Sequence, residues 1–286
     1  MNILVLGGSG QLGQCFRKVA ADKGLDHVVF ANSQQANILN LEALAQVVET
    51  EKPDWVVNCA AYTAVDKAEE DVEVCTAINQ LGARNIAQAC SRYGAKLVHI
   101  STDFVFKGTQ AKLWREDDPT DPINIYGKTK LAGEAEIAGA LAEHFIIRTS
   151  WLYSEFAGNF VKTMLKLANG RTELNVIADQ IGTPTYAIDL AEAVFQVIDS
   201  ANTNYGIYHY SNEGVASWYD FAVAVFDISG TQIQVNPIPT EQYPTPAERP
   251  KFSVMDKSKI KAVFGMQISH WRESLHNCLL NISTMS

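Results

Sequence analysis

The chain has 286 residues, of which 47% are hydrophobic and 19% charged, with 12 Phe, 10 Tyr and 5 Trp. This length and composition fit one large α/β domain or two smaller ones sharing a cleft, and they argue against intrinsic disorder. The net charge of −9 repels phosphate backbones, and no run of Lys and Arg offsets it. We therefore expect no nucleic-acid partner.

Cysteine usage and the first residues of the sequence favour a reducing compartment, the cytoplasm. The five cysteines are odd in number and contain no CxxC pair, which favours free thiols in a reducing environment. The opening MNILVLGGSG lacks a basic n-region, and no apolar stretch approaches the length of a membrane span. We expect a cytoplasmic protein with no membrane partner. The six scattered histidines show no HExxH-like spacing, which disfavours a transition-metal site.

The first half of the chain alternates short apolar runs with amphipathic stretches. Five runs are short and rich in β-branched or aromatic residues, and we predict strands at 3–6, 28–30, 55–58, 97–100 and 145–148. Helical patterns lie between them at 12–20, 41–48 and 78–89. Parallel neighbours need crossover helices, so this alternation predicts an α/β fold with a Rossmann-type, doubly wound parallel sheet.

Beyond residue 150 glycine, proline and aromatic residues become more frequent, as in DQIGTPTYA and IPTEQYPTPAERP. Helical patterns persist at 157–169, 187–200 and 217–228. We expect residues 1–150 to form a dinucleotide-binding domain that later segments complete. Residues 151–286 are expected to form mainly a smaller substrate-binding lobe, interleaved with that domain.

Three glycines, Gly7, Gly10 and Gly13, stand directly between the first predicted strand and the first predicted helix. Glycine there permits a tight turn and a close approach of the backbone to a pyrophosphate, and the helix N-terminus offers N–H groups. An ordinary glycine-rich turn is the alternative. We favour dinucleotide binding because the loop opens a series of strands and helices. The GxxGxxG spacing resembles that of extended short-chain dehydrogenases/reductases.

The end of the second predicted strand bears on the choice of cofactor. It reads FANSQQ, with Ala31, Asn32 and Ser33 where an acid commonly binds the adenosine ribose. No arginine stands there to meet a 2′-phosphate either. We count Asn32 among the cofactor-binding candidates and expect NADPH, with NADH possible.

Three side chains could move a proton during hydride transfer. Thr102 closes the strand in HISTDFVF, while Tyr126 and Lys130, four residues apart in YGKTK, share one face of a predicted helix. A ketone that receives a hydride needs a proton, and a nearby ammonium lowers the pKa of a tyrosine toward the useful range. A strand-end hydroxyl can hydrogen-bond the substrate oxygen. The alternative makes Thr102 a cap and Lys130 a solvated lysine, as we expect for Lys128.

Taken in order, several segments resemble the dTDP-4-dehydrorhamnose reductase family of extended short-chain dehydrogenases/reductases. They include GGSGQLG, VVNCAAYTAVDKAE, HISTDFVFKG, YGKTKLAGE, IIRTSWLYS and VIADQIGTPTYAIDLA. The resemblance implies reduction of the 4-keto group of dTDP-4-dehydro-L-rhamnose to dTDP-L-rhamnose, a step in bacterial polysaccharide biosynthesis.

The resemblance also implies roles for particular residues. Tyr126 would be the proton donor, Lys130 its partner and a ribose contact, and Thr102 the assisting hydroxyl. The sugar would meet Thr102, Asp103 and Trp151. The cofactor would meet Gly10, Gln11 and Leu12 at the pyrophosphate, and Ala61, Tyr62 and Thr63 along its length.

Two departures stand out: Asn37 replaces an acid that is usual near the adenosine, and Glu248 interrupts the usual PARRP.

Several alternatives stay open at this point. The chain could reduce or epimerise another nucleotide sugar, or it could be a non-catalytic regulatory subunit of the same fold. A 4,6-dehydratase usually carries a pair of acids after the threonine, whereas Asp103 is followed by Phe104. Magnesium is possible by resemblance, although no ligand motif places it. A monomer and a homodimer are equally compatible with the sequence.

Overall fold

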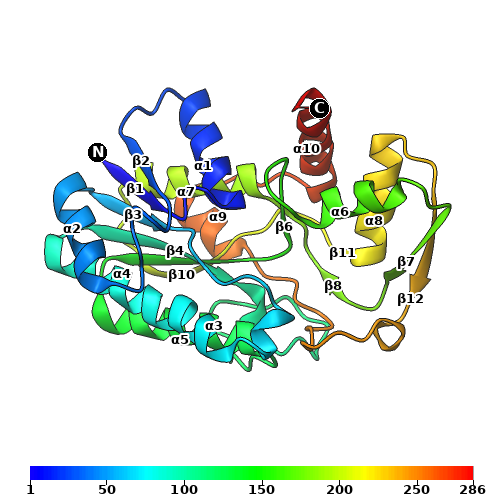
Figure 1. The fold of residues 1–286 in the computed structure, drawn as a ribbon, viewed down its shortest axis with the longest axis horizontal. Helices are drawn as coiled ribbons and strands as arrows, with labels where there is room; N and C mark the ends of the chain where they lie inside the picture. Colours follow the sequence, from blue (N-terminus) through cyan, green and yellow to red (C-terminus); the bar gives the residue numbers. More distant parts are fainter. Residues whose placement is uncertain (286) are drawn as a thin grey trace.

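The computed structural model describes residues 1–285, and its centre is a six-stranded parallel sheet (Figure 1). The strands lie in the order β2-β1-β3-β4-β5-β10, and every neighbouring pair is parallel. Their bounds are β1 Ile3–Leu6, β2 Val28–Ala31, β3 Trp55–Asn58, β4 Lys96–Thr102, β5 His144–Thr149 and β10 Gly206–His209. The predicted α/β fold class with a Rossmann-type parallel sheet is confirmed.

Helices cover both faces of the sheet because successive side chains of a strand point to opposite faces. In β1, Ile3 and Val5 pack in one core cluster, whereas Leu4 and Leu6 pack in another. The first cluster draws on α1 Gln11–Asp22, α7 Ala187–Asp199 and α9 Ser258–Phe264, and the second on α2 Leu41–Glu51, α4 Gly82–Tyr93 and α5 Ile125–Ala140. Figure 1 shows α1, α7 and α9 on one side of the sheet and α4 and α5 on the other.

Two features of this sheet differ from the sequence-based prediction. The helical pattern expected at 78–89 belongs to a longer run, formed by α3 Val72–Thr76, the π-helical turn η2 Ala77–Leu81 and α4. Strand β10 was not predicted, because its four residues, Gly-Ile-Tyr-His, carry no clear apolar pattern of their own. Pairing with β5 fixes it as a strand.

A third core cluster lies to the right in Figure 1, away from the sheet. It joins α6 Phe160–Ala168, α8 Trp218–Ser229 and α10 Trp271–Met285 to the parallel pair β7 Glu173–Ile177 and β12 Gln234–Ile238. Two short pairs complete this part, β6 Leu152–Tyr153 with β9 Thr185–Tyr186 and β8 Ile181–Gly182 with β11 Ala216–Ser217. Single 3₁₀ turns occur as η1 Lys67–Glu69, η3 Asp103–Val105 and η4 Thr240–Gln242. Among the described helices, none combines the length and apolarity needed to cross a membrane.

The strand order creates one topological switch point. From β1 the chain moves outward to β2, then crosses back to β3 and continues outward the other way through β4, β5 and β10. In open parallel sheets the carboxyl ends of the strands at such a point form the ligand-binding crevice. The loops that follow β1 and β3 are therefore the first place to look for a site.

Candidate active site

The loop after β1 has the close backbone packing that only glycine allows. Gly7 has a φ of +77°, and a Cβ atom there would lie 2.8 Å from the backbone nitrogen of Ala60. A Cβ atom on Gly13 would lie 2.3 Å from the carbonyl oxygen of Gly7. Gly10 is the N-cap of α1, and no side chain caps that helix end. The amides of the first turn, including those of Gln11 and Leu12, are thus available to an anion such as a pyrophosphate.

The loop after β3 carries Ala61, Tyr62 and Thr63 and lies against this glycine loop. Asn58 accepts a hydrogen bond from the backbone N–H of Ala60 at 3.0 Å, which turns the chain sharply as β3 ends. Farther along, the buried side chain of Asn79 accepts from the N–H of Tyr62 at 2.8 Å and donates to its carbonyl oxygen at 3.1 Å. The π-helical turn supplies Asn79, so it fixes the loop at the switch point.

Two further cofactor-binding candidates, Asn32 and Gln11, have side chains that form hydrogen bonds within the protein. The Oδ1 atom of Asn32 accepts from the N–H groups of Gln34 and Gln35 at 2.9 and 3.0 Å, forming the turn after β2. Gln11 accepts from the side chain of Asn159 at 2.9 Å, and Asn159 is the N-cap of α6. Gln11 thereby links the glycine loop to the part of the chain beyond residue 150.

Thr102, Asp103 and Tyr126 come together where β4 ends. The N–H of Phe104 donates to the Thr102 hydroxyl, which donates to the Asp103 carboxylate, both at 3.2 Å. Burial raises the pKa of Asp103 to about 6, against hydrogen bonds from Ser253 and Thr102, and its Oδ2 atom has no protein partner. The Tyr126 ring stands edge-on to that of Phe104, with centroids 5.5 Å apart.

Lys130 is a buried residue, not a solvated helix lysine. Its side chain is 2% exposed, while Lys128 two positions earlier is exposed, as we expected. The Nζ atom of Lys130 donates to the carbonyl oxygen of Ile100 at 2.7 Å and lies 3.1 Å from Nε2 of His99. Burial lowers the pKa of Lys130 to about 8.

We expected a nearby ammonium to lower the pKa of Tyr126, but the structure raises it instead. The pKa of Tyr126 is raised to about 12, first by burial, and the Asp103 carboxylate adds to the rise while a hydrogen bond with Thr102 opposes it.

A buried ion pair supports the same helix from behind. Arg148 of β5 donates to both carboxylate oxygens of Glu134, through Nε at 2.9 Å and through Nη2 at 2.6 Å. The two side chains are 2% and 3% exposed. The Ser101 hydroxyl donates to the same carboxylate at 2.5 Å. Because Glu134, Lys130 and Tyr126 are spaced by four, this network fixes the helix face that carries the candidate residues.

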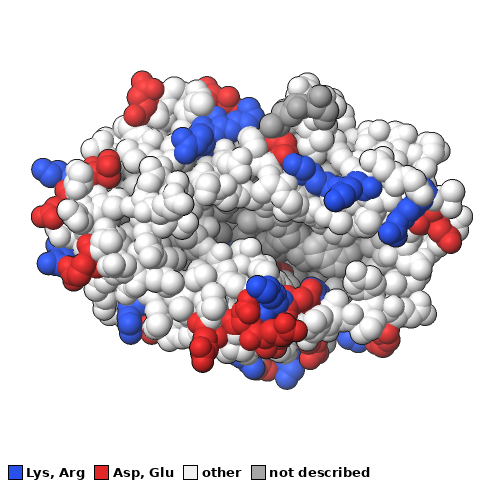
Figure 2. All heavy atoms as spheres, in the orientation of Figure 1, with Lys and Arg blue, Asp and Glu red and all other residues white. Residues whose placement is uncertain are grey.

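A cavity of about 840 Å³ lies in the part of the chain that contains α6 and α8. Its lining includes the aromatic rings of Phe160 and Trp218 and the guanidinium groups of Arg171 and Arg249. Arg249 forms a two-pronged ion pair with Asp66, at 2.9 and 2.7 Å. The pair therefore connects two loops that are far apart in the sequence. Arg249 lies in the loop just before residues 251–253, which bond to Ile181, and Asp66 lies in the loop that follows β3. The space-filling view in Figure 2 shows the molecule hollowed across the middle of this face, with a largely uncharged surface.

Trp151 has a backbone conformation that is uncommon for its residue type. Its φ is +48°, in the left-handed region, which costs energy in any residue except glycine. Its ring stacks on Trp218, with centroids 3.5 Å apart and planes 7° apart. The ring also packs against Gly182, where a Cβ atom would come within 2.7 Å of it. The indole is therefore held firmly next to the large cavity.

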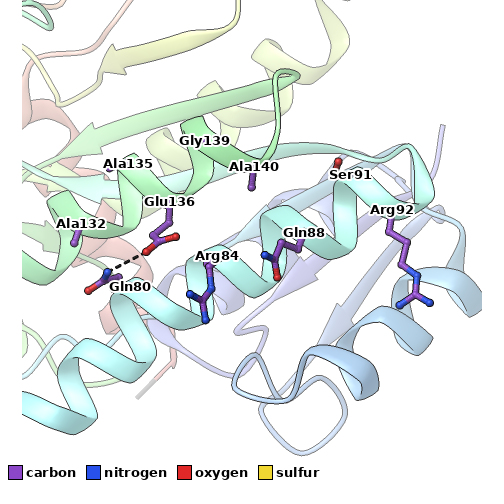
Figure 3. A pocket seen from close by; sticks show the side chains of 10 residues that line it. All are labelled: Gln80, Arg84, Gln88, Ser91, Arg92, Ala132, Ala135, Glu136, Gly139 and Ala140. Carbon is purple, nitrogen blue, oxygen red and sulfur yellow. Dashed lines mark hydrogen bonds between the residues drawn. The ribbon is translucent and has the colours of Figure 1, made fainter.

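A second hollow, of about 770 Å³, lies between α4 and α5 (Figure 3). Its α5 side consists of Ala132, Ala135, Glu136, Gly139 and Ala140. At about 100° per residue, Ala132, Ala135 and Gly139 point away from the side of the helix that carries Tyr126 and Lys130. The hollow is therefore on the outer surface and does not belong to the site at the switch point.

Within residues 1–285, no group of three or more His, Cys, Asp or Glu side chains is placed to hold a metal ion.

Several residues of the site were missed by sequence reasoning. They are the polar groups Asn58, Asn79, His99, Glu134, Arg148 and Arg249. Glu134 had a usable signal, since it continues the spacing of four from Tyr126 and Lys130. His99 and Arg148 had a weaker one, as polar residues inside apolar strands.

A glycine loop at a helix N-terminus, combined with Thr102, Tyr126 and Lys130 at the carboxyl end of a neighbouring part of the parallel sheet, defines an oxidoreductase that uses a nicotinamide dinucleotide. The family can be stated from comparison with known proteins. The model of the RmlD substrate binding domain family matches residues 1–284. The chain belongs to this family.

Named relatives agree with that assignment. A dTDP-4-dehydrorhamnose reductase of Aggregatibacter actinomycetemcomitans is 39% identical over 285 residues, covering 96% of this chain and 97% of that protein. The crystal structure of a dTDP-4-dehydrorhamnose reductase from Clostridium acetobutylicum has a TM-score of 0.95 at 41% identity, covering 99% of this chain and 100% of that one. The enzyme of the same name from Bacillus anthracis, in complex with NADP, has a TM-score of 0.94 at 38% identity, covering 98% and 100%.

Proposed function

We propose that this chain is an NAD(P)H-dependent reductase that converts the 4-keto group of dTDP-4-dehydro-L-rhamnose to the alcohol of dTDP-L-rhamnose, for polysaccharide biosynthesis. The observation that carries the proposal is the common contact of Thr102 and Tyr126 with Phe104 where β4 ends: the Phe104 N–H donates to the Thr102 hydroxyl at 3.2 Å, and the Phe104 ring stands edge-on to that of Tyr126. The glycine loop would hold the pyrophosphate of the dinucleotide, and the bound cofactor would supply the hydride.

The proton that completes the alcohol comes from Tyr126. A pKa raised to about 12 keeps the phenol protonated at neutral pH, so it is in the acid form that reduction needs. Thr102 shares the carbonyl oxygen as a hydrogen-bond partner and helps to hold it against the phenol. Lys130 contacts the ribose of the cofactor and stabilises the phenolate left after proton transfer.

The glycine loop fits the pyrophosphate of the dinucleotide, since its open amides carry no side-chain cap. In this proposal the cofactor contacts are made by Gly7, Gly10, Gln11, Leu12, Gly13, Asn32, Ala61, Tyr62, Thr63, Tyr126 and Lys130. No acid follows β2 to favour a free 2′-hydroxyl, so we propose NADPH as the preferred cofactor, with NADH also accepted.

The 840 Å³ cavity is large enough for a nucleoside diphosphate sugar and supplies both kinds of contact that such a ligand needs. Phe160 and Trp218 can stack with the base, while Arg171 and Arg249 can pair with the diphosphate. Trp151 and Asp103 would then contact the sugar, next to Thr102.

This arrangement supports a division of labour between residues 1–150, completed by later segments, as the dinucleotide-binding domain and residues 151–286 as mainly the substrate lobe. We also propose a cytoplasmic location, where the five free cysteine thiols stay reduced.

The test is Tyr126→Phe, which removes the donated proton and keeps the ring against Phe104. We expect the variant to bind NADPH as the wild type does, measured by fluorescence titration, and to lose at least about a hundredfold in kcat. A variant that retains near-normal turnover would refute Tyr126 as the proton donor.

A further inference from the structure

Behind Tyr126, a chain of buried hydrogen bonds runs from the backbone of one loop to the backbone of β4. The N–H of Ala60 donates to Oδ1 of Asn58 at 3.0 Å, and Nδ2 of Asn58 lies 2.9 Å from Nδ1 of His99. Nε2 of His99 lies 3.1 Å from Nζ of Lys130, which donates to the carbonyl oxygen of Ile100 at 2.7 Å. The three side chains are each 2% exposed or less.

The direction of these bonds can be worked out from the proton count of each group. The oxygen of Asn58 faces the N–H of Ala60, so its amide nitrogen faces His99 and must donate to Nδ1. Nδ1 therefore carries no proton, and the neutral imidazole has its proton on Nε2. That N–H points at Nζ of Lys130. An ammonium group has three donors and no acceptor, so only the uncharged amine of Lys130 can complete the chain.

The charged and titratable groups around this chain of hydrogen bonds agree with an uncharged Lys130. Burial lowers the pKa of Lys130 to about 8 and that of His99 well below its usual value. The groups that act on the two nitrogens are Glu134 of α5, Cys59 after β3, Cys75 of α3 and His144 of β5. Glu134 is the one that favours a charged lysine most strongly, but its carboxylate is already paired with Arg148. Burial raises the pKa of both thiols, so they carry no charge near neutral pH.

We propose that His99 is a positioning residue that holds Lys130 as an uncharged amine in the ligand-free protein at mildly alkaline pH, and that dinucleotide binding releases Lys130 to take up one proton from solvent. This inference rests on the proposed function, because it takes the cofactor ribose as the group that draws Lys130 away. A protonated Nζ no longer accepts from Nε2–H of His99, so the ammonium turns toward the hydroxyl groups in the cleft. The step adds one proton to the amine and breaks no covalent bond.

A charged Lys130 would serve the reaction, because a nearby cation stabilises the phenolate formed by proton transfer. Cofactor binding would keep Lys130 charged at mildly alkaline pH, where burial would otherwise favour the uncharged amine.

The experiment is isothermal titration calorimetry of NADPH into the full chain in Tris and in HEPES, two buffers with different enthalpies of ionisation. A proton taken up by the protein is drawn from the buffer, so the observed heat differs between buffers in proportion to the uptake. With a pKa of about 8 before binding and the ordinary lysine value of about 10.4 after it, uptake is about 0.1 proton at pH 7.0 and about 0.75 at pH 8.5. The 2′-phosphate, with a second pKa of about 6, is fully ionised at pH 8.5 and contributes nothing.

His99→Gln is the matched perturbation, because a glutamine oxygen can accept from a lysine ammonium. We expect it to bind NADPH at least as tightly as the wild type at pH 8.5 while the uptake falls below about 0.2 proton. His144→Asn is the control: His144 is buried near His99, but its Nδ1 bonds to the carbonyl oxygen of Leu141 and not to Lys130. This control should keep the wild-type uptake.

The outcomes separate the two proposals. NADPH binding with equal heats in both buffers at pH 8.5 would overturn the charge change at Lys130 and leave the proposed function standing. Full uptake in His99→Gln would overturn the role of His99. No binding of either NADPH or NADH would overturn both proposals. The wild-type pH profile alone is decisive even if a variant does not fold, because uptake must rise between pH 7.0 and 8.5.

Discussion

Arg148→Met is a direct test of the packing that positions the candidate catalytic helix. The substitution removes a guanidinium that makes two hydrogen bonds, at 2.9 and 2.6 Å, to the Glu134 carboxylate. Glu134 is 3% exposed and would remain as an unpaired buried charge, with only the Ser101 hydroxyl as a donor. Breaking a buried pair in this way costs about 3–5 kcal/mol of unfolding free energy.

The assay is equilibrium urea unfolding at pH 7 with the wild type as reference. In the double variant Glu134→Gln/Arg148→Met the buried charge is gone, while an amide oxygen still accepts from Ser101. We expect it to regain at least about half of the loss, because much of the cost comes from the uncompensated carboxylate. Lys18→Met is the matched surface control. Its partner Asp22 lies at 2.9 Å but both side chains are well exposed, so the loss should stay below about 0.5 kcal/mol. A loss below about 1 kcal/mol in Arg148→Met would refute the reasoning.

Two further predictions concern the glycine loop and Asp103. Gly13→Ala places a Cβ atom 2.3 Å from the Gly7 carbonyl oxygen, so the loop must shift. The NADPH dissociation constant should therefore rise at least about tenfold in fluorescence titrations. Gly139→Ala is the control: no atom lies within 4 Å of the added Cβ, so this variant should bind NADPH normally and gain about 0.5–1 kcal/mol of stability. Burial in the folded protein raises the pKa of Asp103 from 3.8 to about 6. The folded protein therefore binds the carboxyl proton more tightly than the unfolded chain does. The stability that this proton contributes is present below pH 4 and is lost as pH rises through 6. Urea unfolding from pH 4 to 7 should therefore show the wild type losing about 2 kcal/mol relative to Asp103→Asn, and parallel pH profiles would contradict the raised pKa.

Much of the sheet could be predicted because its strands are buried on both faces. Segments such as Ile3–Leu6 and Trp55–Asn58 read as short apolar runs, and the helices between them show the matching periodicity. Strands that depend on a partner were harder to predict. In β7 exposed residues alternate with the buried Leu174 and Val176, whereas β12 has only exposed and half-buried residues and contains Pro237. The pairing of β12 with β7 is what identifies it as a strand.

The candidate site divides in the same way. Gly7, Thr102, Tyr126 and Lys130 could be named from local spacing, because each stands at a fixed offset from a strand end or a helix start. The groups that set the protonation of these residues could not be predicted from the sequence. His99 reaches Lys130 from another strand, and Arg148 reaches Glu134 from a third element. Sequence separation hides such contacts, and the resulting fall in the pKa of Lys130 to about 8 follows from burial that spacing does not reveal.

The central claim is that this chain reduces a 4-keto sugar nucleotide, and one measurement tests it most directly. Purified protein is mixed with dTDP-4-dehydro-L-rhamnose and NADPH or NADH, oxidation is followed at 340 nm, and the product is identified by NMR. We predict stoichiometric cofactor oxidation and formation of dTDP-L-rhamnose, faster than with other 4-keto sugar nucleotides. Cofactor binding without oxidation, or a clear preference for a different nucleotide sugar, would contradict the account.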